Sequence, residues 1–146
     1  MPKGISVGKT VEVTSNEDGF LGSYSEAKVL ARVDRDKYEV EYTKLLDDRD
    51  ANKFLREVVE AALVRPLPPE IRVSGFDVLD KVDAYDNEVW WVGRVTGMDG
   101  PNRYSVYFDS SGDEYTYPFH ELRVHQEYDD GQWVTPERKG KVYSAL

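Results

Sequence analysis

The feature of this sequence that most constrains its fold is an internal repeat. Residues 24–42 match residues 90–108 at a constant offset of 66 positions. The matched positions keep their aromatic or β-branched character: Tyr24 with Trp90, Val29 with Val95, Tyr38 with Tyr104, Val40 with Val106, and Tyr42 with Phe108. A chain of 146 residues is long enough for two small domains. The repeat therefore predicts two copies of one small unit.

A proline-rich connector separates the two copies. It runs Arg65-Pro66-Leu67-Pro68-Pro69, and prolines lack an amide donor and stiffen the chain. We therefore place the first domain at residues 1–69 and the second at residues 70–146, the latter with a C-terminal tail. The first copy also carries extra residues within positions 43–52.

Short strands with alternating apolar residues are predicted in each copy. In the first copy, apolar residues alternate at Ala27, Val29, Ala31 and Val33, and residues 38–42 form the next strand after a polar turn. The second copy repeats this order, with strands expected over residues 78–84, 90–95 and 104–108.

One segment, residues 51–63, fits two structures. Its apolar residues follow the spacing of an amphipathic helix, and Asp50 could cap that helix. The matching stretch 113–118 instead alternates with period two and contains Pro118. We therefore favour a fourth strand over residues 54–58 and a fifth strand from Leu63, with the helix as the alternative. Five short, bent strands in each copy predict an all-β fold, with two tandem five-stranded barrels packed as one unit.

Charge and composition narrow the choice of partner. The chain has 28 acidic and 19 basic residues, a net charge of −9, so its surface should repel nucleic acid and anionic membranes and attract a basic peptide. There is no cysteine, which excludes disulfides and thiol catalysis. No apolar stretch is long enough for a transmembrane helix, so we expect no membrane partner.

Motifs for catalysis or metal binding are missing from the sequence. His120 and His125 are five residues apart, a spacing that aligns them neither on a helix nor on one face of a strand. There is no Gly-x-Ser-x-Gly elbow and no glycine-rich nucleotide loop before a helix. We expect no enzymatic activity, no cofactor and no metal.

Short motifs recur in both copies. The first copy contains Val7-Gly8-Lys9-Thr10-Val11-Glu12-Val13, Gly19-Phe20-Leu21-Gly22-Ser23-Tyr24 and Val64-Arg65-Pro66, and the second contains Asp80-Lys81-Val82-Asp83-Ala84-Tyr85, Trp90-Trp91-Val92-Gly93 and Leu122-Arg123. With these motifs, residues 5–134 resemble plant Agenet domains. The first copy carries Tyr24-Ser25 where many family members have tryptophan followed by an aromatic residue.

The resemblance implies a fold, a partner and a cellular location. Agenet domains belong to the Tudor-like Royal family of five-stranded barrels, usually occur in pairs, and several bind methylated lysine on histone tails. For this chain the resemblance implies a nuclear module that reads the N-terminal tail of histone H3, dimethylated at lysine nine and unmodified at lysine four, in heterochromatin and gene silencing. We expect the tandem module to be monomeric.

Aromatic rings in the first copy form a candidate methyl-lysine cage. A methylated ammonium keeps its charge but loses hydrogen-bond donors, so it binds best to the faces of several rings. Phe20 and Tyr24 follow the first strand and Tyr42 ends the third, and these chain segments are expected to converge at one end of a small barrel. One carboxylate of Asp47 or Asp48 would accept the remaining N–H of dimethyl-lysine, which favours dimethyl over trimethyl.

The second copy offers a second candidate cage at equivalent places, formed by Tyr85, Trp90 and Phe108. Small barrels also fill their interiors with aromatic rings, so core packing is the alternative for this trio. Two other functions stay open: a single-stranded RNA-binding module that stacks bases on the same rings, and a protein-interaction module indifferent to lysine methylation. The acidic charge disfavours RNA.

Overall fold

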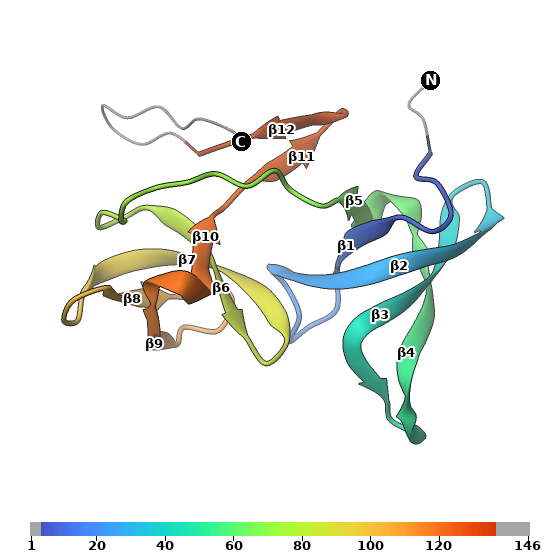
Figure 1. The fold of residues 1–146 in the computed structure, drawn as a ribbon, viewed down its shortest axis with the longest axis horizontal. Helices are drawn as coiled ribbons and strands as arrows, with labels where there is room; N and C mark the ends of the chain where they lie inside the picture. The colour runs from blue at the N-terminus through green and yellow to red at the C-terminus, as the bar shows by residue number, and fades with distance from the viewer. Residues whose placement is uncertain (1–3, 137–146) are drawn as a thin grey trace. The chain divides into compact units, whose positions relative to one another are not determined.

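The structure of this chain is a computed structural model that describes residues 4–136. It contains two compact units, unit 1 at Met1–Leu67 and unit 2 at Pro68–Leu146. Figure 1 shows that strands build both units. Over residues 4–136 the only helical elements are two short 3-10 turns, and neither could span a bilayer.

Unit 1 is an antiparallel sheet of five strands. They are β1 (Thr10–Thr14), β2 (Ser23–Asp34), β3 (Lys37–Asp47), β4 (Asp50–Glu60) and β5 (Val64–Pro66). They pair in the order β5-β1-β2-β3-β4. A 3-10 turn at Ala61–Leu63 leads from β4 to β5, and no ladder joins those two strands in the described part of the chain. The predicted all-β class is confirmed, whereas the predicted closed barrel is wrong because the turn leaves the sheet open between β4 and β5.

The segment that fitted either a helix or a strand is β4. It pairs with β3 along most of its length, from Lys37 opposite Glu60 to Asp47 opposite Asp50. The predicted strand is confirmed and the helix is wrong. The helical spacing arises because apolar residues lie on both faces of β4: Leu55 and Val59 pack against the core, whereas Phe54 and Val58 are exposed.

Alternating residues of the strands fill the core of unit 1. Its buried members come from every strand except β4: Val11, Val13, Ala27, Val29, Tyr38, Val40, Tyr42 and Val64. Because side chains alternate across a strand, the residues between these positions lie on the outer face. The extra residues of the first copy lengthen β3 and β4 into a hairpin that extends past the rest of the unit (Figure 1).

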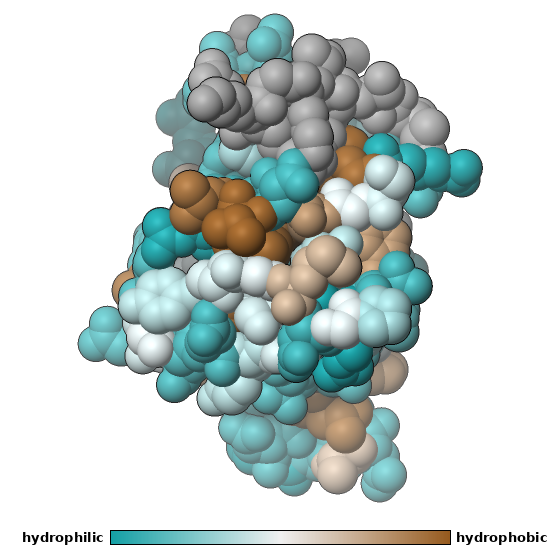
Figure 2. Space-filling model, turned by 90° about the vertical axis from the view of Figure 1, so that its left-hand side faces the viewer, coloured by the Kyte–Doolittle hydropathy of each residue, from teal (hydrophilic) through white to brown (hydrophobic). Residues whose placement is uncertain are grey.

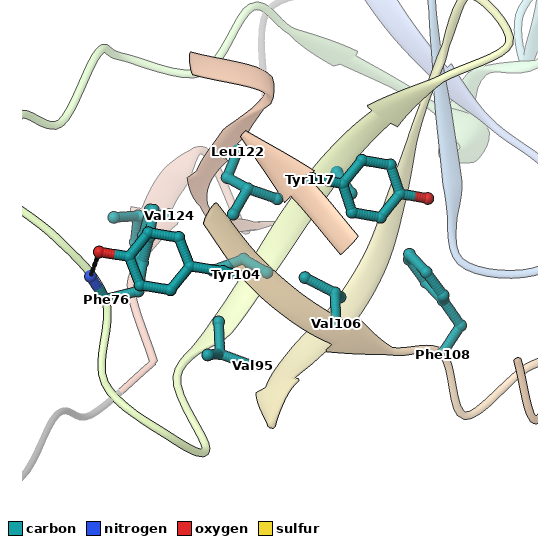
Figure 3. Close-up of a cluster of buried hydrophobic side chains, with 10 residues drawn as sticks. Phe76, Val95, Tyr104, Val106, Phe108, Tyr117, Leu122 and Val124 are labelled. Atoms are coloured by element: carbon teal, nitrogen blue, oxygen red, sulfur yellow. Dashed lines mark hydrogen bonds between the residues drawn. The ribbon is translucent and has the colours of Figure 1, made fainter. Parts of the chain in front are cut away.

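Unit 2 repeats this topology with strands β6 to β10. Its strands are β6 (Lys81–Asp86), β7 (Val89–Met98), β8 (Arg103–Tyr107), β9 (Glu114–Pro118) and β10 (Leu122–Val124), with a 3-10 turn at Phe119–Glu121. They pair in the order β10-β6-β7-β8-β9. Figure 3 shows the core, in which the Tyr104 hydroxyl accepts a hydrogen bond from the backbone N–H of Phe76 at 3.3 Å.

A further hairpin, which was not among the predicted strands, follows β10. It consists of β11 (Glu127–Asp129) and β12 (Gln132–Val134). The turn between them has positive φ at Asp130 (48°) and Gly131 (78°), as a tight two-residue hairpin turn requires. Residues 137–146, most of the predicted C-terminal tail, lie outside the described residues.

A buried histidine ties this hairpin to the sheet of unit 2. His125 is 1% exposed, and its Nδ1 lies 2.6 Å from Asp83 Oδ1 while its Nε2 lies 2.6 Å from Glu127 Oε1. Burial alone would lower the pKa of His125, but the hydrogen bonds and charges of the two carboxylates outweigh it and raise that pKa above its ordinary value. The His125 ring thus links β6 to the first residue of β11.

Candidate functional site

Unit 1 contains a hollow of about 560 Å³, which we call the first-repeat hollow. It lies between the loop that joins β1 to β2 and the paired strands β3 and β4. Three small or apolar residues, Val13, Ser23 and Ser25, line it from β1 and β2. Phe20 and Tyr42 supply the aromatic lining, and Glu17, Glu57 and Glu60 supply carboxylates.

The β1–β2 loop holds Phe20 at this hollow through hydrogen bonds of its own. The Glu17 N–H donates to Ser15 Oγ at 3.0 Å, and the Phe20 N–H donates to the Glu17 carbonyl at 3.1 Å. The Ser23 hydroxyl then donates to the Phe20 carbonyl at 2.6 Å. Gly19 and Gly22 take positive φ values of 86° and 75°, which a residue with a side chain rarely adopts. Phe20 is 50% exposed in this loop.

Tyr42 and Glu57 form the polar part of the hollow. Tyr42 is buried on β3, and its hydroxyl donates to Glu57 Oε2 on β4 at 2.8 Å. Burial, and after it the hydrogen bond to Glu57, raises the pKa of the Tyr42 hydroxyl above its usual value. The phenol therefore stays a neutral donor, and the carboxylate keeps lone pairs for a cationic ligand.

Tyr24, the third predicted cage residue, does not join this hollow. No register shift interrupts β2 between Tyr24 and Val29, so strict alternation puts Tyr24 on the opposite face of the sheet from Ala27 and its partner Tyr42. The Tyr24 ring is instead covered by Arg65, whose guanidinium carbon lies 3.5 Å from the ring centroid. Arg65 also makes a buried ion pair with Glu12 at 2.7 Å.

The predicted carboxylates Asp47 and Asp48 also lie away from the hollow. Asp47 ends β3 and Asp48 lies in the turn at the far end of the β3–β4 hairpin, where Asp47 Oδ1 accepts a hydrogen bond from the Arg49 N–H at 2.8 Å. Neither residue lines the hollow, and the carboxylate beside Tyr42 is Glu57. The sequence carried a signal for the face on which Glu57 lies. Glu57 stands midway between Leu55 and Val59, and on a strand these three alternate residues face inward together.

The second predicted trio divides between the two faces of unit 2. The rings of Tyr85 and Trp90 lie 5.0 Å apart, and the guanidinium of Arg123 lies 4.1 Å from the Trp90 ring centroid. Phe108 instead lies in the core, where its ring is 6.0 Å from that of Tyr117 (Figure 3). Arg123 pairs with Asp83 at 2.8 Å, so this unit repeats the carboxylate–arginine–aromatic stack of Glu12, Arg65 and Tyr24.

Among the described residues, no group of three or more histidine, cysteine, aspartate or glutamate side chains is placed to hold a metal ion. The hollow offers aromatic faces, hydroxyls and carboxylates. These groups suit an organic cation, because ring faces attract positive charge and carboxylates accept its N–H groups.

Comparisons with known proteins agree with this topology. The Agenet domain family model matches residues 8–69. Protein AGENET DOMAIN (AGD)-CONTAINING P1 of Arabidopsis thaliana is 38% identical over 138 residues, which cover 94% of this chain and 26% of that protein. DUF724 domain-containing protein 3 of the same plant is 35% identical over 133 residues, covering 87% of this chain and 19% of that protein. The chain thus spans about a quarter or less of the length of these curated relatives.

Two crystal structures give the same result for the fold. The structure of Arabidopsis thaliana AGDP1 AGD34 has a TM-score of 0.84 at 36% identity and covers 90% of this chain and 89% of that one. The structure of ADCP1 tandem Agenet domain 3-4 has a TM-score of 0.81 at 32% identity, with coverage of 90% and 88%. The resemblance found in the sequence is therefore confirmed: this chain belongs to the Agenet domain family and has the fold of a tandem Agenet pair.

Proposed function

We propose that this chain binds methylated lysine on a basic peptide through the first-repeat hollow, as an interaction module and not as an enzyme. The observation that carries the proposal is the meeting of the half-exposed Phe20 ring with the hydrogen-bonded pair of Tyr42 and Glu57 in one hollow. Each ring contact to a desolvated cation contributes about 0.5–2 kcal/mol. The net charge of −9 adds long-range attraction for a basic tail.

The proposed ligand is the N-terminal tail of histone H3 dimethylated at lysine nine, which makes the module a nuclear reader in heterochromatin and gene silencing. Membership of the Agenet family supports this choice of partner class. The Glu57 carboxylate supports the methylation state, because it has lone pairs left for the single N–H of dimethyl-lysine. Trimethyl-lysine has no such proton, so the lone pairs of Glu57 that Tyr42 does not use would receive no hydrogen bond from the ligand.

Titration calorimetry with H3 peptides carrying zero to three methyl groups on lysine nine tests the proposal. We expect the tightest binding for the dimethylated peptide. Phe20→Ala should weaken it by about 1–2 kcal/mol, which is roughly fivefold to thirtyfold, because one cation–π face is lost.

Phe54→Ala is the matched control for this variant. Phe54 is an exposed phenylalanine of β4, 44% accessible, that does not line the hollow, so its removal should leave the affinity unchanged. Equal affinity of wild type and Phe20→Ala would contradict the assignment of the site. Equal affinity for all four peptides would instead favour a methylation-independent protein-interaction module.

The proposed reader also requires lysine four of the tail to be unmodified. A bare ammonium donates three hydrogen bonds, and each methyl group removes one and adds bulk. A peptide that is trimethylated at lysine four and dimethylated at lysine nine should therefore bind more weakly than one with lysine four free. The same affinity for both would contradict this part of the proposal, and tight binding of single-stranded RNA would contradict the choice of a cationic partner.

A further inference from the structure

The two repeats differ at one strand position that bears on the first-repeat hollow. Ser25 of β2 pairs with Val13 of β1, and Trp91 of β7 pairs with Ala84 of β6. The offset of 66 positions that relates the repeats also relates Ser25 to Trp91. The smallest hydroxyl side chain and the largest aromatic side chain therefore occupy equivalent places in the sheets of the two units.

In unit 1, the serine leaves this place open. Ser25 lines the hollow beside Ser23, and both lie on the face of β2 that bears Ala27 and Val29. Larger apolar residues at these two positions would fill the space between β2 and the β1–β2 loop. Their small hydroxyl side chains instead leave space beside Tyr42.

In unit 2, the tryptophan occupies the corresponding place. Trp91 is half-buried and packs against the core, and its indole N–H donates to the Asp86 carbonyl at 3.0 Å. Val89, at the position of Ser23, is also buried. Phe108 stands at the position of Tyr42 and has no hydroxyl, and the tyrosine–carboxylate hydrogen bond of this unit joins other strands: the Tyr117 hydroxyl of β9 donates to the Asp86 carboxylate of β6 at 2.8 Å. Unit 2 thus keeps an aromatic ring at the position of Tyr42, with an indole where unit 1 has a serine.

We propose that the side chain at this strand position decides which repeat accepts the methylated lysine: Ser25 opens the site in the first repeat, and Trp91 closes its counterpart in the second. The inference rests on the proposed function, because it concerns the same ligand and the same hollow. It adds a determinant of specificity that neither ring nor carboxylate supplies. A peptide with one dimethyl-lysine should then bind with a stoichiometry of one per chain.

The test is Ser25→Trp, measured by titration calorimetry with the H3 peptide dimethylated at lysine nine. The new side chain enters open space, so we expect the variant to fold with a melting temperature close to that of wild type and to lose at least about tenfold in affinity, since the indole takes the place of the ligand. Ser25→Leu adds a smaller side chain to the hollow and serves if the tryptophan disturbs the fold. It should lose less affinity than Ser25→Trp. Lys28→Trp, which adds the same indole at an exposed position on the opposite face of β2, should bind like wild type.

The outcomes separate this inference from the proposed function. Wild-type binding together with equal or tighter binding by folded Ser25→Trp overturns the role of Ser25 and leaves the reader function standing. No binding of any methylated peptide by wild type overturns both. The reverse variant, Trp91→Ser, should raise the stoichiometry from one to two if it folds, and a folded variant that still binds one peptide contradicts the closure of the second repeat by Trp91.

Discussion

At the scale of single residues, the proposed function assigns to Glu57 the discrimination between dimethyl-lysine and trimethyl-lysine. Glu57 is the carboxylate bonded to Tyr42, and it reaches the hollow from β4, whereas Asp48 lies at the far end of the hairpin. The sequence could have excluded Tyr24 from the cage by counting alternate positions from Ala27 along β2. The alternation of Leu55, Glu57 and Val59 could have placed Glu57 on the inward face of its strand. Its contact with Tyr42 could not have been predicted, because it depends on the pairing of β3 with β4, which contains irregular register shifts.

Glu57→Gln should reduce the preference for dimethyl-lysine over trimethyl-lysine. The substitution keeps the shape of the side chain and removes its charge, which attracts both methylated ligands. It also removes the charged acceptor that only the N–H of dimethyl-lysine uses, and hydrogen bonds to charged groups contribute about 1.5–3 kcal/mol. We expect affinity for the dimethylated peptide to fall about tenfold and the ratio of the two affinities to move toward one. Calorimetry with both peptides measures this. Asp48→Asn is the control for a lost surface charge, and an unchanged ratio in Glu57→Gln would remove that carboxylate from the site.

His125 should make the stability of unit 2 depend on pH. Its folded pKa is raised by Asp83 and Glu127, whereas an unfolded histidine has a pKa of about 6.5. The stabilisation is therefore fully present below pH about 6.5 and is lost as pH rises through the folded pKa. Urea unfolding from pH 6 to pH 9 should show falling stability for wild type and a flatter profile for His125→Gln. The exposed His120→Gln should follow wild type, and parallel profiles for all three would contradict a stabilising imidazolium.

At the scale of secondary structure elements, the β3–β4 hairpin is the clearest difference between the repeats. The sequence located its extra residues and, through comparison with the second repeat, its strand character. Periodicity alone suggested a helix, because the apolar residues of β4 lie on both faces of the strand and their combined spacing imitates that of a helix. The β11–β12 hairpin had a usable signal that was missed: an Asp-Gly turn between Tyr128 and Trp133, whose rings lie 4.9 Å apart.

Shortening the β3–β4 hairpin should leave peptide binding intact. Replacing residues 46–54 with Asn-Gly removes the exposed pair of Leu46 and Phe54 together with Asp47 and Asp48, and keeps Leu45 and Leu55, which line the hollow. Exposed charges and a solvated hairpin end contribute little free energy, so we expect affinity within about twofold of wild type. Calorimetry and thermal unfolding measure this together. A large loss of affinity in a folded variant would restore Asp47 and Asp48 as ligand contacts.

At the scale of the whole molecule, negative charge is spread over both repeats. Residues 1–70 contain 14 acidic and 11 basic residues, and residues 71–146 contain 14 and 8. Figure 2 shows a face that is mostly hydrophilic with a compact hydrophobic patch. Charge of this kind accelerates encounters with a basic tail and does not by itself choose the mark that is read. Net charge needs no knowledge of the fold, so the sequence alone gives it, and the attraction of a basic peptide that follows from it stays a prediction.

Salt should therefore weaken binding without changing the role of the rings. From about 0.1 M to about 1 M NaCl the Debye length falls from about 10 Å to about 3 Å. We expect several-fold weaker binding of the dimethylated peptide, mainly through a slower association rate. Phe20→Ala should show the same dependence on salt from a lower starting affinity, since ring contacts act at short range. Surface plasmon resonance measures both rates, and affinity independent of salt would contradict electrostatic attraction of the tail.

The paired stacks of Glu12, Arg65 and Tyr24 and of Asp83, Arg123 and Trp90 have a consequence for engineering. In each, the chain's own guanidinium lies against an aromatic ring and a carboxylate, much as a foreign cation would. Truncating Arg65 to alanine would leave a cavity with the shape of a guanidinium between the Tyr24 ring and Glu12. The buried Glu12 carboxylate would then lack its cationic partner. Millimolar guanidine or methylguanidine should refill the cavity and recover lost folding stability. A small molecule would then act as a dose-controlled switch for this module.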